Sequence, residues 1–117
     1  MGDKLGLKLA AERGIKLRDV GDQILFENEL IRVWDIKLEP GQTLDFHIHY
    51  HPYLVVSLGG GSNEIETIFG QKISTEEPVG SFVFIDEMRA VHRLTNRSNV
   101  NYLSRLIEMK SVTWTTD

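Results

Sequence analysis

The chain has 117 residues, of which 41% are hydrophobic, which suits one packed domain. Its 13 basic and 17 acidic residues give a net charge of -4, and the scattered basic residues argue against nucleic acid and anionic membrane surfaces as partners. No apolar run approaches the roughly 20 residues that span a bilayer, and no signal peptide is recognisable, so we expect a soluble, cytoplasmic protein. The absence of cysteine means that histidine, carboxylate or tyrosine must hold any metal.

The chain is predicted to begin with an arm and to continue as a β domain. Residues 1–23 are expected to be helical or irregular, because Leu5 and Leu9 lie one helical turn apart and Gly14 can end a short helix. Residues 24–117 contain short β-rich runs separated by turn residues such as Pro40-Gly41. The predicted strands are residues 24–26, 30–38, 43–49, 53–58, 64–69, 72–75, 81–86, 90–95 and 101–109. Many short strands without an internal repeat favour a sandwich or barrel.

The faces of the predicted strands differ in character. In the run 30–38, Trp34, Ile36 and Leu38 share one face, which is the alternation of a half-buried strand. The runs 53–58 and 81–86 are apolar on both faces. An antiparallel sheet covered on both faces needs a second cover, either from the arm or from another subunit. We therefore expect a homodimer.

Three of the four histidines lie within five residues, at His47, His49 and His51. Side chains two positions apart on a strand project to the same face, so His47 and His49 can bind one ion while Ile48 points away. The remaining histidine, His92, lies in a later strand that barrel closure can bring opposite the pair. Three neutral imidazoles leave a divalent ion with its full charge and with open positions, which is typical of a catalytic site.

A simpler interpretation of His47 and His49 is an exposed polar face. On a regular strand Leu44, Phe46 and Ile48 form one apolar face, and Asp45 lies with the two histidines on the other. His92 alone is more typical of a satisfied core histidine than of a metal ligand.

The spacing of these residues resembles the two motifs of the cupin superfamily. Gly41, His47, His49 and Gly60 match the pattern Gly-x5-His-x-His-x3-Glu-x6-Gly. The second pattern, Gly-x5-Pro-x-Gly-x2-His-x3-Asn, is similar to the segment 80–96, with His92 as the ligand and Asn96 four residues later. The resemblance covers about half of the chain. It implies an all-β fold, a double-stranded β-helix or jelly-roll barrel, with a site for a divalent metal held by His47, His49 and His92.

The chain departs from these motifs at several positions. Tyr53 stands where the first motif has glutamate, Asp86 and Met88 replace the proline and a glycine of the second, and His92 comes one residue late. The site therefore resembles that of the three-histidine cupins, with His51 or the Tyr53 hydroxyl as a candidate fourth contact. The segment 32–41 is also similar to small cupins associated with β-alanine degradation.

Three further residues have a candidate role and a simpler alternative. Tyr53 is either a core aromatic or a donor of a hydrogen bond or proton to a substrate, and His51, before Pro52, is either catalytic or part of the pocket mouth. Arg89 either forms a solvated pair with Glu87 or binds a substrate carboxylate. Trp114 is expected to pack on the barrel or on a neighbour.

Three functions are compatible with such a site. The first is an enzyme resembling Fe(II) dioxygenases that acts on a small anionic metabolite. The second is an isomerase or lyase in which Zn, Ni or Mn acts as a Lewis acid. The third is a non-catalytic protein that binds a small molecule or metal.

Overall fold

The chain folds into one short helix and nine strands within residues 3–116, which the computed structural model describes. The elements are α1 (Lys4–Glu12), β1 (Gln23–Glu27), β2 (Ile31–Leu38), β3 (Thr43–His47), β4 (Tyr53–Ser57), β5 (Ser62–Thr67), β6 (Lys72–Glu76), β7 (Phe82–Ile85), β8 (His92–Asn96) and β9 (Tyr102–Met109). This confirms the all-β fold with a short helical arm. Within the described residues, no helix has the length and apolar character needed to cross a bilayer.

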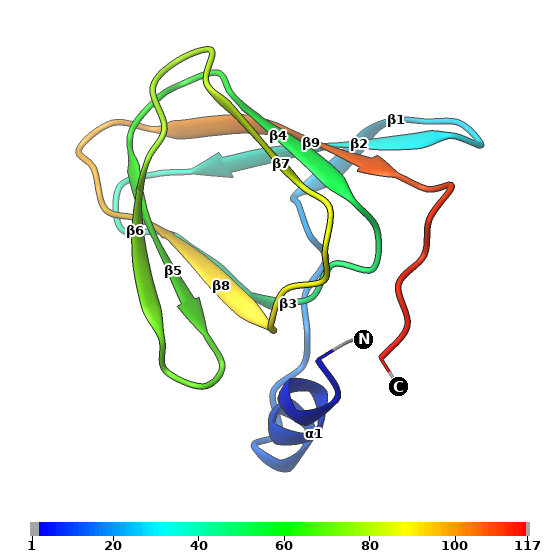
Figure 1. Ribbon diagram of the computed structural model, residues 1–117. Helices are drawn as coiled ribbons and strands as arrows, with labels where there is room; N and C mark the ends of the chain where they lie inside the picture. The colour runs from blue at the N-terminus through cyan, green and yellow to red at the C-terminus, as the bar shows by residue number, and fades with distance from the viewer. Residues whose placement is uncertain (1–2, 117) are drawn as a thin grey trace.

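The strands form two antiparallel sheets that face each other across the interior (Figure 1). One sheet has the order β1-β2-β9-β4-β7, and the other has the order β3-β8-β5-β6. Apart from the consecutive pairs β1-β2 and β5-β6, neighbours in each sheet are distant in sequence, because the chain passes repeatedly between the two sheets, as in a jelly roll. The first strands of the chain therefore lie beside the last ones, which brings His47 and His92 within reach of each other.

The core lies between the sheets and follows the predicted alternation of β2. Trp34, Ile36 and Leu38 point inward and are buried, together with Tyr102 and Leu106 from β9. Asn96, at the end of β8, is also fully buried and donates from Nδ2 to the carbonyls of Leu38 (2.9 Å) and Val100 (2.8 Å). This side chain therefore fixes the two turns at the end of the barrel opposite the histidines.

The arm packs on the outside of the segments that carry the histidines. Ala10 of α1 is buried against Ile48 and Val91, which are the chain neighbours of His49 and His92. Asp3 joins the two regions, because its carboxylate accepts from Gly6 N (3.0 Å) at the start of α1 and from Val91 N (2.6 Å). The arm thus supports the backbone behind the site.

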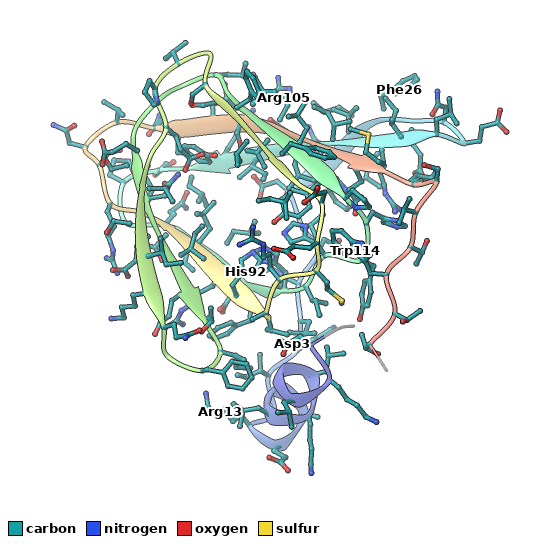
Figure 2. The ribbon with its side chains drawn as sticks, viewed as in Figure 1. Asp3, Arg13, Phe26, His92, Arg105 and Trp114 are labelled. Atoms are coloured by element: carbon teal, nitrogen blue, oxygen red, sulfur yellow. The ribbon has the colours of Figure 1, made fainter. Side chains whose placement is uncertain are left out.

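The outer face of the five-stranded sheet has no such cover within residues 3–116. Cross-strand neighbours place Val33, Leu54, Phe84 and Ile107 on this face, and Phe82, Phe84 and Phe26 are 74%, 51% and 53% exposed. Figure 2 shows Phe26 and Arg105 pointing away from the interior, and Arg105 pairs with Asp35 at 2.7 Å. The arm lies beside β3 and β8 instead (Figure 1), so the idea that it covers β4 and β7 is wrong.

We still predict that a second copy of the chain covers the outer face of the five-stranded sheet. Aromatic side chains contribute on the order of 150–250 Å² each when buried, and these three phenylalanines are 74%, 51% and 53% exposed, so together they can bury roughly 270–450 Å². Their aliphatic neighbours would have to supply the rest of the roughly 800 Å² per partner of a standard interface. The charges at the centre of this face, Asp35 and Arg105, already pair with each other, so a second copy can pack its own apolar face here without leaving a charge unpaired.

Light scattering should give twice the chain mass for the unsubstituted protein, and the mass of one chain for Phe84→Lys. Leu5→Lys, on the exposed side of α1, is the control that should remain dimeric, and a monomeric unsubstituted protein would contradict the prediction.

Candidate metal centre

A β-bulge at the end of β3 turns His47 toward the interior. Leu44 pairs with Leu94 and His47 pairs with His92. The interval is three residues along β3 but two along β8, so β3 contains one extra residue between these pairs. The extra residue reverses the alternation, and Leu44 and His47 both line the interior while Phe46 packs toward the arm. The expectation that Leu44 and Phe46 share one face is therefore wrong.

The structure brings three histidine rings together. His47 lies 4.5 Å from His92 and 5.1 Å from His49 between ring centroids, and His49 lies 5.3 Å from His92. One nitrogen from each ring can be chosen so that all three lie within 4.8 Å of one another. The residues are only 3%, 3% and 9% exposed, in the order His47, His49 and His92, so the alternative of an exposed polar face is wrong. Figure 2 shows His92 inside the barrel.

Backbone carbonyls orient two of the rings. His47 Nδ1 lies 2.8 Å from the carbonyl of Asp45, and His92 Nδ1 lies 2.6 Å from the carbonyl of Ala90. A carbonyl only accepts hydrogen bonds, so each Nδ1 carries the proton and the lone pair of the neutral ring lies on Nε2. This is the tautomer that a metal-binding imidazole with a hydrogen-bonded second nitrogen adopts.

His49 is held in a different way. β3 ends at His47 rather than at the predicted residue 49, so His49 lies in the irregular segment that follows the strand. Its ring stacks on that of Tyr53, with centroids 3.9 Å apart and an interplanar angle of 18°. Its Nδ1 is buried without a hydrogen-bond partner among the described residues. The aromatic contact therefore sets the orientation of this ring.

Burial keeps all three rings neutral. Burial, and then the neighbouring His92, lower the pKa of His47 from 6.5 to about 3. Burial and the other two histidines hold the pKa of His49 well below 6.5. Burial also lowers the pKa of His92, against the effect of its hydrogen bond to Ala90. Neutral rings can accept a cation without first losing a proton.

The donor set fits a divalent transition metal. Three imidazoles converge, two of them with the lone pair on Nε2, and the third has a buried nitrogen without a partner. Imidazole suits Fe, Zn, Ni and Cu, so these ligands are consistent with a divalent metal without selecting one. His47, His49 and His92 would hold the ion.

The three histidines open into a cavity of about 520 Å³ between the sheets. Tyr53 and Arg89 line it with them, while Val55, Leu94 and Leu106 provide apolar walls. Burial raises the pKa of Tyr53 to about 12, against the opposing effect of Arg89, so the phenol stays protonated at neutral pH. Arg89 has no ion-pair partner within residues 3–116, and the solvated pair with Glu87 does not form.

The structure does not bring His51 into the cluster. Its Nδ1 lies 2.8 Å from the carbonyl of Val112 in the C-terminal tail, and its side chain does not line the cavity. Pro52 follows it, and the chain turns there before β4 begins at Tyr53. The backbone N–H of Trp114 donates to the carbonyl of Tyr50 (2.7 Å), which holds the C-terminal segment against the barrel. His51 therefore anchors the tail.

Sequence reasoning missed a polar group that lines the same cavity at Thr75, Glu77 and Tyr102. A signal was present in the last strand, where Tyr102 and Ser104 share the inward face with Leu106. Polar residues on an inward face require partners inside the barrel. The partner carboxylate of Glu77 comes from the turn after β6 and could not be placed from its spacing.

Comparison with solved structures places this fold among the cupins. A cupin domain from Bordetella pertussis is 25% identical, with a TM-score of 0.69, over 83% of this chain and 99% of that one. A conserved protein with a double-stranded β-helix domain from Klebsiella pneumoniae is 15% identical, with a TM-score of 0.61, over 85% of each chain. A cupin 2 conserved barrel domain protein from Salinispora arenicola is 16% identical, with a TM-score of 0.56, over 89% of this chain and 84% of that one.

No protein-family model matches the sequence, and no curated protein matches it. The likeness to cupins of β-alanine degradation has no support in these comparisons and remains an expectation from the segment 32–41.

Proposed function

We propose, from the premise that this chain is a cupin, that it is a metal-dependent enzyme that oxidises a small anionic molecule with dioxygen. The observation that carries the proposal is the set of three neutral imidazoles, without a carboxylate, on the wall of a largely apolar cavity. Such a ligand set leaves the double charge of the ion uncompensated, which favours an anionic substrate. When bound, Fe(II) would supply the redox chemistry with dioxygen.

Arg89 is suited to bind the anionic group of the substrate. Arg89 lines the cavity together with His92 and Tyr53, and its charge lowers the pKa of both, as expected of a cation close to them. A guanidinium without a protein partner can bind a carboxylate through two parallel hydrogen bonds. Arg89 would thereby orient the substrate beside the three histidines.

Tyr53 is suited to donate a hydrogen bond to the substrate. The phenol remains protonated because burial raises its pKa to about 12, and its stacking on His49 fixes the ring beside the ligand set. The motif position of Tyr53 is that of a carboxylate ligand in other cupins, so a neutral donor here replaces a negative ligand. Tyr53 would hold its proton and stabilise negative charge that develops on the substrate.

The test is metal analysis combined with oxygen uptake, on protein purified without a histidine tag. We expect one iron per chain after anaerobic loading with Fe(II), and oxygen consumption that depends on a member of a panel of small carboxylates. Stoichiometric zinc, nickel or manganese with isomerase or lyase turnover and no uptake would favour the Lewis-acid alternative. Substoichiometric, mixed metal without turnover would favour a non-catalytic protein, and either result would overturn the proposal.

Arg89→Met provides the matched variant for the same assay. Loss of charge-assisted hydrogen bonds worth about 1.5–3 kcal/mol should raise KM for the carboxylate by roughly 10- to 100-fold while metal content stays unchanged. Arg97→Met is the control, because Arg97 pairs with Glu64 on the outer side of the other sheet.

A further inference from the structure

A polar group closes the end of the cavity opposite the histidines. Its members are Asn63, Thr75, Glu77, Tyr102 and Ser104. Asn63 pairs with Asn96, four residues along β8 from His92, which corresponds to roughly 13 Å at the rise of a strand. Glu77 and Tyr102 line the same cavity as the three histidines. A single ligand of moderate length can therefore contact both ends.

The Glu77 carboxylate has donors but no cation. Tyr102 donates to Oε1 at 2.7 Å, while the Asn63 amide and the Thr75 hydroxyl donate to Oε2 at 2.5 and 2.9 Å. Within residues 3–116 no lysine, arginine or histidine forms an ion pair with it. A carboxylate offers about four lone-pair sites, so three neutral donors leave room for one more. The carboxylate is half-buried, and no cation within residues 3–116 pairs with it.

A further polar atom in this group has no partner. Asn63 Oδ1 is buried and makes no hydrogen bond with the described residues, and Asn63 is 1% exposed. The Ser104 hydroxyl lies on the same inward face of β9 as Tyr102 and can donate as well as accept a hydrogen bond. A buried amide oxygen can only accept, and leaving it unpaired costs about 1–3 kcal/mol. This end of the cavity therefore has an excess of acceptors.

The two ends are separated by apolar walls. Val55, Leu94 and Leu106 line the cavity between them, with Ile36 and Ile65. A ligand that fits such a cavity has an anionic group at the end with Arg89, an apolar middle, and a hydrogen-bond donor at the end with Glu77.

We propose that the substrate carries a hydrogen-bond donor, an ammonium group in preference to a hydroxyl, on the end of the molecule that lies against Glu77. The proposal deepens the proposed function and rests on it, because the anionic group of the same molecule lies at the histidines. Ammonium is preferred because it neutralises the Glu77 charge, and hydrogen bonds between charged groups are about twice as strong as neutral ones. The substrate class is thus a linear or cyclic amino acid whose amino and carboxyl groups lie far apart.

The test uses matched carboxylates on the metal-loaded protein. Octanoate, ω-hydroxyoctanoate and ω-aminooctanoate are titrated by calorimetry, together with their six- and ten-carbon analogues. We expect the amino compound to bind at least tenfold more tightly than the unsubstituted one at the best chain length, with the hydroxy compound between them. Glu77→Gln should remove that difference, and Glu64→Gln, an acidic residue on the outer side of β5, should preserve it.

The outcomes separate this inference from the proposed function. Equal affinities for amino and unsubstituted chains, or a preference that persists in Glu77→Gln, would overturn the inference while metal-dependent carboxylate binding upholds the function. No binding of any carboxylate would overturn both. Metal content reports whether each variant is folded at the site, and Glu77→Asp, which withdraws the carboxylate by one methylene, replaces Glu77→Gln if the latter does not fold.

Discussion

Replacing His47 and His49 together by alanine should abolish stoichiometric metal binding while the barrel stays folded. The two rings supply two of the three converging nitrogens, and a single imidazole at His92 cannot retain a divalent ion against solvent. The core residues Trp34, Ile36 and Leu106 belong to an apolar cluster that does not include the histidines. Loss of two buried polar rings at a cavity wall should therefore change the free energy of unfolding by no more than about 1–3 kcal/mol.

Elemental analysis and metal-dependent stabilisation measure this result. A metal at 100 times its Kd should raise the unfolding free energy of the unsubstituted protein by about 2.7 kcal/mol, and it should give no increase in the double variant. His51→Ala is the matched control, because it removes a histidine from the same segment whose ring binds the Val112 carbonyl instead. Full metal content in the double variant, or loss of metal in His51→Ala, would show that the ion lies elsewhere.

The sequence predicted the meeting of His47, His49 and His92, but part of the geometric reason was different. The prediction rested on a regular strand through residue 49, whereas β3 ends at His47 and contains a bulge after Leu44. The bulge places His47 opposite His92, and stacking on Tyr53 then holds His49. The alternation of Leu44, Phe46 and Ile48 is equally compatible with a regular strand, so nothing in the spacing could reveal the extra residue.

The nine strands were predictable because each is a short β-rich run between turn residues. The partners of single polar side chains were not, because they depend on contacts between distant segments. His51 stands beside the two ligands in sequence, yet its ring binds the tail at Val112. Glu77 lies in a turn, and its three donors come from β5, β6 and β9. Such contacts follow from the packing of the two sheets and leave no periodic pattern.

The late position of His92 shows how the fold tolerates a change in spacing. The second motif expects the histidine one residue earlier, at the position of Val91. The irregular segment between β7 and β8 absorbs the extra residue, and β8 begins at His92 with its ring facing inward. Val91 then points toward the arm, where it packs with Ala10 and Ile48. The arm therefore helps to fix which residue of this segment faces the other two histidines.

The metal-free protein should lose stability when the pH falls from 7 to 5. Burial lowers the pKa of His47 from 6.5 to about 3, so the folded ring stays neutral in this range while the unfolded chain takes up a proton. The contribution of His47 to the free energy of unfolding is fully present above pH 6.5 and is lost as the pH falls toward 3. For His47 alone the unfolding free energy should fall by about 2 kcal/mol between pH 7 and 5. The lowered pKa values of His49 and His92 act in the same direction.

Urea unfolding with a chelator present measures this loss at pH 7, 6 and 5. Carboxylates remain largely ionised over this window, so the decrease reports mainly on histidines. His47→Gln, which is neutral at every pH, should reduce the decrease by about 2 kcal/mol because the unfolded variant gains no proton at this position. An unchanged decrease in His47→Gln would mean that the ring is protonated in the folded state. The hypothesis that three neutral histidines bind the metal would then be wrong.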